Sequence, residues 1–185
     1  MKAILPIIHS PLALALALFA GVMPSLGAIL SVTGNDTLVG NRPASLITNG
    51  SFTMGQPGAT AGNGPEHTVT LSAFVMDVNL VTYSLWTEVY KWATTHGYTF
   101  AHAGAGKGAT HPVQMVDWYD AVKWCNARSE MSNLTPCYYT DATKTPDKVY
   151  RSGNIDLANN YVNWSANGYR LPTEAEWERA ARGGK

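Results

Sequence analysis

The chain of 185 residues has the length of one domain with an added segment, rather than of two full domains. Its residues are 45% hydrophobic and only 14% charged, which excludes an intrinsically disordered chain. The 13 basic residues equal the 13 acidic residues in number, and no basic stripe is present, so the charge gives no support for nucleic-acid binding.

Residues 1–28 have the order of regions found in a secretory signal peptide. Lys2 supplies one positive charge, residues 12–23 form an apolar stretch, and residues 25–28 offer small side chains suited to cleavage. The rival interpretation is an uncleaved membrane anchor. Prolines interrupt the apolar run, and its uninterrupted part is shorter than the roughly 20 residues of a spanning helix, which favours cleavage. We therefore predict a protein that is secreted or held in the periplasm or cell envelope, without a stable membrane span.

Export permits disulfides, and the chain has two cysteines, Cys125 and Cys137. Two are too few for a disulfide scaffold, so the hydrophobic core must hold the fold. The two cysteines can pair with each other, or either can pair with a cysteine outside this chain; the sequence leaves both pairings open. Their neighbouring residues favour buried or disulfide-bonded thiols over nucleophiles.

Residues 29–43 are predicted to be a lead-in linker, and the domain is expected to occupy residues 44–185. Residues 47–54 are typical of a strand broken by an Asn-Gly turn, and residues 67–78 alternate apolar and polar side chains as one strand or two do. Between them, residues 56–65 are rich in glycine and proline and predict a loop.

A first helix is predicted from its N-cap, Thr82, to about His96. Apolar side chains recur there at three- and four-residue spacing, and Gly97 stands where a left-handed C-terminal cap belongs. Residues 98–111 then predict a loop rich in glycine and alanine, and residues 112–116 predict a short strand.

A second helix is predicted over residues 118–131, with Asp117 as its N-cap and Asp120 near the positive end of the helix dipole. Residues 133–167 are expected to be largely irregular, and no internal repeat is visible. Short strands are predicted within them at residues 137–140, 148–151 and 161–164.

The last segment, residues 169–184, has the strongest local signals. Pro172 disfavours helix at the residue before it, and Thr173 with Glu176 has the T-x-x-E spacing of a capping box. In such a box two backbone donors at the start of a helix are satisfied reciprocally. Two consecutive glycines then end the predicted helix.

The polar residues do not form a convincing catalytic centre. The three glutamates within residues 174–178 are expected to serve the cap and the helix dipole rather than acid–base catalysis, and Arg170 is expected in a structural ion pair. Two histidines of the loop, His102 and His111, are interpreted as accidental surface positions. Four histidines lack the spacing of a metal motif: His67, His96, His102 and His111.

Five segments, in their order along the chain, resemble the formylglycine-generating enzyme family, also called the sulfatase-modifying factor enzymes. They are NGSFTMG (residues 49–55), PEHTVTLSAFVMD (65–77), VTYSLWTEV (81–89), HPVQMVDWYDAVKWCNARSE (111–130) and NGYRLPTEAEWERAARGG (167–184). The resemblance covers roughly residues 44–185, and its last segment is highly specific.

The resemblance implies an α+β fold of the complex C-type-lectin-like kind. It also implies an oxidoreductase, because the best-known activity of the family is the oxidation of a cysteine in a sulfatase to formylglycine by molecular oxygen, with copper. Copper and calcium are implied for complete family enzymes, and a sulfatase is the implied protein substrate. The family also contains non-catalytic modules, so the alternative is a C-type-lectin-like binding module of the cell envelope or secreted fraction.

The resemblance carries no catalytic or metal residue onto this sequence. In the family, the cysteine pair that holds copper and the residues of the calcium sites come after the point that corresponds to Lys185. We therefore expect a domain that is truncated at its C-terminus and has no cofactor site within this chain. Cys125 and Cys137 do not match the copper pair in position or context, and Cys125 resembles a structural helix cysteine of some members.

Overall fold

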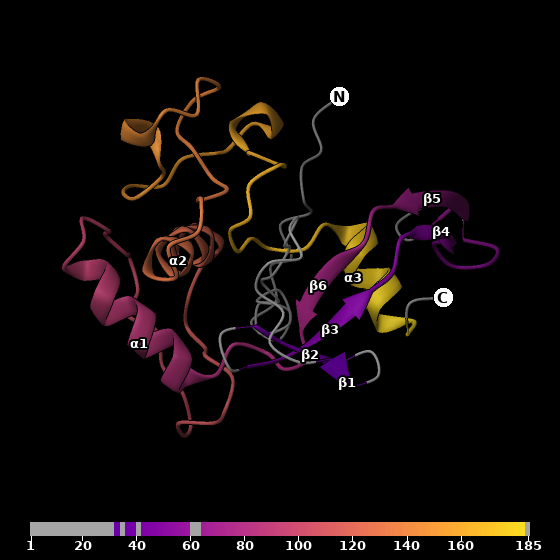
Figure 1. Cartoon of the computed structure of the whole chain (residues 1–185), viewed down its shortest axis with the longest axis horizontal. Helices are drawn as coiled ribbons and strands as arrows, with labels where there is room; N and C mark the ends of the chain where they lie inside the picture. The colour runs from indigo at the N-terminus through magenta and orange to yellow at the C-terminus, as the bar shows by residue number, and fades with distance from the viewer. Residues whose placement is uncertain (1–31, 34–35, 40–41, 60–63, 184–185) are drawn as a thin grey trace.

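A computed structural model describes residues 32–33, 36–39, 42–59 and 64–183 of the chain (Figure 1). The predicted signal peptide lies outside the described residues. In the described part, no helix is long and apolar enough to cross a membrane. The elements form a mixed α+β arrangement, as predicted, with the two longer helices on one side of the molecule and the sheets on the other (Figure 1).

Four short antiparallel strands form the larger sheet, in the order β1-β2-β3-β6. They are β1 (Val32–Thr33), β2 (Asp36–Val39), β3 (Arg42–Ile47) and β6 (Phe74–Asp77). β6 is buried along its whole length and pairs with β3, where Val75 faces Leu46. Residues 29–43, predicted to be a lead-in linker, thus contribute β1, β2 and the start of β3 to this sheet.

A separate antiparallel pair consists of β4 (Gly50–Met54) and β5 (His67–Leu71). The buried side chain of Phe52 lies opposite Val69 in this pair. The predicted break within residues 47–54 is confirmed, since β3 and β4 belong to different sheets. For the same reason residues 67–78 form two strands rather than one.

The two longer helices are α1 (Tyr83–Thr94) and α2 (Trp118–Met131), and both begin at the predicted N-caps. The side chains of Thr82 and Asp117 each accept a hydrogen bond from a backbone amide in the first turn, which satisfies a donor that the helix itself cannot. After α1, Gly97 has φ 85°, the left-handed conformation that glycine adopts readily.

α2 is the centre of the core. It lies between α1 and the irregular residues 133–167 (Figure 1), and its Trp124 ring stacks on Trp86 of α1 with centroids 5.4 Å apart. A helix buried on nearly all sides must pair its polar side chains internally. Its buried residues are Asp120, Ala121, Val122, Lys123, Trp124, Cys125, Asn126, Ala127, Arg128 and Ser129.

Asn126 ties α2 to the irregular segment. Its Oδ1 accepts from the amides of Cys137 at 3.1 Å and Tyr138 at 3.0 Å. Its Nδ2 donates to the carbonyls of Tyr138 at 2.7 Å and Tyr150 at 3.2 Å. One fully buried side chain therefore replaces the backbone ladder that a sheet would supply at this point.

The prediction of short strands in residues 112–116 and 133–167 is wrong, because only isolated β-bridges form there. Gln114 pairs with Ala105, but the next residue, Met115, has φ 56°, and a left-handed residue ends an extended segment. In the irregular segment the bridges are Tyr138–Val162 and Tyr139–Val149. Two short 3₁₀ helices also occur there, η3 (Pro146–Lys148) and η4 (Asn159–Tyr161).

The last helix, α3 (Glu174–Ala181), begins with the predicted capping box. The Thr173 hydroxyl accepts from the amide of Glu176 at 3.2 Å, and the Glu176 carboxylate accepts from the amide of Thr173 at 2.8 Å. Both hydrogen bonds satisfy donors that would otherwise lack a partner near the protein interior.

α3 lies beside the β4–β5 pair in the folded chain (Figure 1), although it comes more than 100 residues later in the sequence than the end of β5 (Leu71 to Glu174). Glu178 accepts from the amide of Gly55 at 2.9 Å, and Arg182 donates to the carbonyl of the same glycine at 2.7 Å. Arg179 donates to the carbonyl of Gly50 at the other end of β4. These contacts clamp both ends of β4 to one helix.

Candidate functional site

The N-terminal end of α2 binds the loop of residues 98–111 through one carboxylate. Asp120 is fully buried, and its two oxygens accept from the amides of Ala101 at 2.8 Å and His102 at 3.1 Å. Its own amide donates to Oδ1 of Asp117 at 2.7 Å, which is the N-cap hydrogen bond. The loop is therefore fixed to the helix through its backbone.

This arrangement places the ring of His102 beside the carboxylates of Asp117 and Asp120. Nδ1 of His102 lies 2.9 Å from Oδ2 of Asp120 and 3.7 Å from Oδ2 of Asp117. One nitrogen or oxygen atom from each of the three residues lies within 4.8 Å of the others. The side chain of His102 is 52% exposed and that of Asp117 34%, so the cluster opens to solvent on one side.

His102 is exposed, as predicted for a surface position, but its contacts with Asp120 are specific rather than accidental. The structure holds its backbone and its ring on Asp120, whereas His67, His96 and His111 are not members of the cluster. Sequence reasoning placed Asp120 near the helix dipole but missed its hydrogen bonds to the loop. No local spacing signals them, because the loop and the helix meet only in the folded chain.

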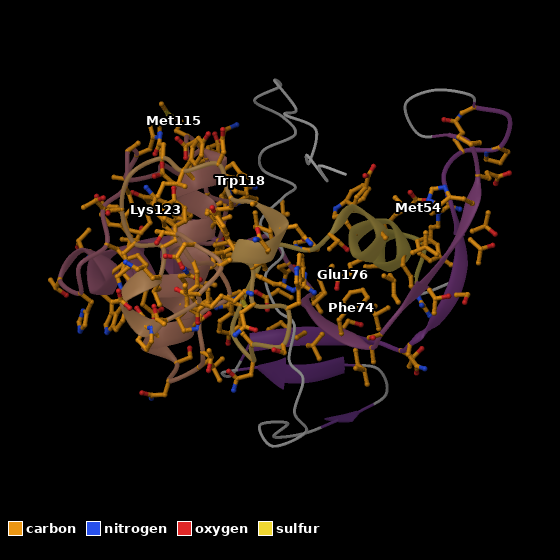
Figure 2. The ribbon with its side chains drawn as sticks, turned by 90° about the horizontal axis from the view of Figure 1, so that it is seen from above. Met54, Phe74, Met115, Trp118, Lys123 and Glu176 are labelled. Atoms are coloured by element: carbon orange, nitrogen blue, oxygen red, sulfur yellow. The ribbon has the colours of Figure 1, made fainter. Side chains whose placement is uncertain are left out.

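Lys123 supplies a positive charge behind the cluster. Its Nζ lies 3.7 Å from Oδ1 of Asp120 and donates to the carbonyl of Gly153 at 3.0 Å. It also lies over the rings of Phe100 and Tyr150. Figure 2 shows Lys123 among the densely packed side chains of the helical part. This buried ammonium balances the charge of Asp120 from the interior side.

The two cysteines are buried and free in the structure. Burial raises the pKa of both thiols, to about 11 for Cys137 and further for Cys125. At neutral pH both are therefore protonated, and a buried neutral thiol is neither a nucleophile nor a metal ligand. This agrees with the prediction that neither one is a nucleophile.

Native protein should resist alkylation at both thiols. With a pKa near 11, about one Cys137 side chain in a thousand is a thiolate at pH 8. We expect no iodoacetamide adduct on the folded protein and two adducts after unfolding in guanidinium without a reductant, read by intact mass. Adducts that form only after a reductant is added would show that a disulfide joins these cysteines to each other or to another chain.

The carboxylates near α3 serve structure, as predicted. Arg170 donates from both terminal nitrogens to Glu176, at 2.7 and 2.6 Å, and both side chains are buried. Glu178 is engaged with β4 and with Arg182 at 2.7 Å, and Glu174 is exposed in the first turn.

A groove of about 620 Å³ runs between α1 and the loop of residues 98–111. A Cβ at Gly106 would lie 2.5 Å from the side chain of Tyr83, so glycine is needed for the loop to approach the helix. Residues that line it are Tyr83, Ser84, Thr87, Glu88, Lys91, Gly106, Gly108 and Ala109.

Residues 34–185 match the profile of the sulfatase-modifying factor enzyme 1-like domain. The chain belongs to this family. The match begins ten residues before the predicted domain start at residue 44, which agrees with the place of β2 in the larger sheet (44 − 34 = 10).

Relatives of the family support the assignment. The chain is 34% identical over 155 residues to the formylglycine-generating enzyme of Thermomonospora curvata, covering 75% of this chain and 48% of the relative. It is 33% identical over 149 residues to the enzyme of the same name from Streptomyces coelicolor, covering 75% and 46%. It is 37% identical over 156 residues to the chaperone protein LppX of Paenibacillus barcinonensis, covering 84% and 50%. The chain thus spans about half the length of the curated relatives it matches.

Solved structures confirm the fold. CarF superposes with a TM-score of 0.60 at 32% identity, covering 77% of this chain and 56% of CarF. Treponema denticola variable protein 1 superposes with a TM-score of 0.58 at 28% identity, covering 84% and 58%. The predicted α+β fold of the formylglycine-generating, C-type-lectin-like kind is therefore confirmed.

Copper, which the family implies, does not fit the residues described here. Copper(I) prefers accessible thiolates, whereas both cysteines of this chain are buried and protonated. The His102 cluster offers one imidazole and two carboxylates, a donor set without sulfur.

Proposed function

We propose that the protein oxidises a cysteine of an exported target protein to formylglycine, with molecular oxygen as the oxidant and copper as the cofactor. The observation that carries the proposal is the family match over residues 34–185. It is supported by relatives named formylglycine-generating enzyme at 29 to 34% identity.

The described residues contribute the scaffold to this function. Their buried thiols do not meet the requirement for copper, so the metal ligands must come from other residues of the protein. The part played by this chain is to hold the strands and loops in place, through the α3 clamp on β4 and the Asn126 hydrogen bonds. Export of the protein is likewise part of the proposal and is supported by the signal-peptide pattern of residues 1–28.

The test uses protein expressed from the complete reading frame and loaded with copper(I). A sulfatase-type peptide with one cysteine is incubated with it in air, and conversion of the thiol to an aldehyde is read as a mass loss and by aldehyde labelling. A peptide with serine in place of the cysteine, and protein treated with a chelator, are the controls. Absence of conversion by copper-loaded, folded protein would overturn the proposed activity.

A second candidate function, suggested by the name of the relative chaperone protein LppX, is the binding of a partly folded protein without chemistry. The groove beside α1 would be a surface for such binding. The same protein should then suppress the aggregation of reduced lysozyme at equimolar ratio with no mass change in the cysteine peptide. Unchanged light scattering would exclude this second function.

A further inference from the structure

We propose that His102, Asp117 and Asp120 bind one divalent transition-metal ion of the zinc class at the N-terminal end of α2. The proposal is independent of the copper chemistry above, since it uses a donor set of imidazole and carboxylates. The candidate ligand atoms are Nδ1 of the histidine and Oδ2 of each aspartate. They come from two elements that are separate in sequence, the loop of residues 98–111 and α2.

The distances suit a small metal ion. Zinc lies about 2.0–2.2 Å from imidazole nitrogen and carboxylate oxygen, so its ligand atoms are roughly 3 to 3.5 Å from one another. Here Nδ1 of His102 is 2.9 Å from Oδ2 of Asp120 and 3.7 Å from Oδ2 of Asp117, and one donor atom from each residue lies within 4.8 Å of the other two. Small torsions of the half-exposed histidine and Asp117 side chains close the remaining difference.

The ligands are held in place before an ion arrives. Asp120 is fully buried and fixed by the loop amides, one of which belongs to His102 itself. Asp117 uses Oδ1 for the cap on the Asp120 amide, which leaves Oδ2 for the ion. Supporting hydrogen bonds of this kind orient metal ligands and raise affinity. The exposed side of the cluster leaves room for water as a further ligand.

The local charge favours a cation, but moderately. Two carboxylates carry two negative charges, and Lys123, 3.7 Å from Asp120, returns one positive charge. The positive end of the α2 dipole also opposes a cation. The balance remains negative. Imidazole in the set selects zinc, nickel or cobalt over calcium and magnesium, which prefer oxygen ligands alone.

A competing explanation needs no metal: His102 can simply serve as a hydrogen-bond donor to the two carboxylates. The two explanations differ in what Asp117→Asn does. Asparagine caps helices about as well as aspartate, so the variant keeps the fold and the helix start. It removes the negative charge of one metal ligand. If the cluster binds a metal ion, the affinity for that ion falls; if His102 is only a hydrogen-bond donor, the parent binds no ion here and there is no affinity to lose.

The experiment measures binding of Zn²⁺ and Co²⁺ to the purified protein at pH 7.5 by calorimetry and by the visible absorption of bound Co²⁺. We expect one ion per chain at this cluster and a rise of the melting temperature with Zn²⁺. Affinity should fall at least tenfold in His102→Gln and in Asp117→Asn. The matched control, His111→Gln, changes another histidine of the same loop and should bind as the parent does.

Three results would overturn the proposal. The first is the absence of zinc and cobalt binding by the folded parent protein. The second is binding that His102→Gln leaves unchanged, which would place the ion elsewhere. The third is calcium binding with the same affinity as zinc, which would show a carboxylate site without a role for the imidazole.

Discussion

Replacing Asn126 with alanine is expected to lower the free energy of unfolding by about 4 to 6 kcal/mol. The change leaves the amides of Cys137 and Tyr138 and the carbonyl of Tyr150 without partners in the buried interior, whereas the Tyr138 carbonyl keeps its hydrogen bond from the Tyr150 amide. Each buried group that loses its partner costs about 1–3 kcal/mol. Because the whole stability of a domain is about 5–15 kcal/mol, a loss of this size removes about a third or more of it and unfolds a domain at the lower end of the range.

The measurement is urea unfolding followed by circular dichroism and tryptophan fluorescence. Asn160→Ala is the matched control, because Asn160 is exposed in η4 and its loss should change stability by less than about 0.5 kcal/mol. If the variant unfolds at the same urea concentration as the parent, then the irregular segment is held by something other than these four hydrogen bonds.

Replacing Glu176 with alanine is expected to cost about 3 to 5 kcal/mol. The change leaves the guanidinium of Arg170 buried without its carboxylate, and the remaining contacts of Arg170, to the Leu171 carbonyl and over the Trp164 ring, do not neutralise its charge. It also removes the reciprocal half of the capping box at Thr173.

A double-mutant cycle separates the two causes. Arg170→Met in the Glu176→Ala background removes the unpaired charge, so the double variant should be more stable than Glu176→Ala alone. Glu174→Ala, an exposed glutamate in the same helical turn, is the control and should cost well under 1 kcal/mol. Equal effects of Glu174→Ala and Glu176→Ala would contradict a specific role for the buried pair.

The buried pair of Arg170 and Glu176 should also make the free energy of unfolding depend on pH in the acidic range. Burial tends to raise the pKa of Glu176, but hydrogen bonds and charge from Arg170, and hydrogen bonds from Thr173, outweigh it and hold the pKa below the ordinary value. A carboxyl with a lowered folded pKa stabilises the protein above its unfolded pKa, near 4.3. That contribution is lost as the pH falls below about 4 through the folded pKa. The parent should therefore have a higher urea midpoint than Glu176→Gln at pH 7, and the difference between the two midpoints should be smaller at pH 3.

The helices follow from residues that are close in sequence. Thr82 and Asp117 cap α1 and α2, and Thr173 with Glu176 opens α3, because a cap uses side chain and backbone only a few residues apart. Such contacts can be predicted without knowledge of the fold. The break between β3 and β4 is predictable for the same reason, since an Asn-Gly pair marks a turn locally.

The other features depend on contacts between distant residues. His102 and Asp120 meet only when the loop folds over α2, and no spacing rule connects them. The strand predicted at residues 112–116 fails because Met115 takes a left-handed conformation, which its residue type does not signal. β1 and β2 lie in residues predicted to be a linker, and they become strands only through their pairing with each other and with β3.

The clamp of α3 on β4 has a consequence for synthesis on the ribosome. The hydrogen bond from the Gly55 amide to Glu178 spans 123 residues, and that from Arg182 back to Gly55 spans 127. At about 5–20 residues per second, roughly 6 to 25 seconds pass between the emergence of the two partners. During that interval the β4–β5 hairpin is exposed to proteases and to other nascent chains. Docking of the hairpin on α3 therefore cannot precede the synthesis of α3, which follows α1 and α2 along the chain.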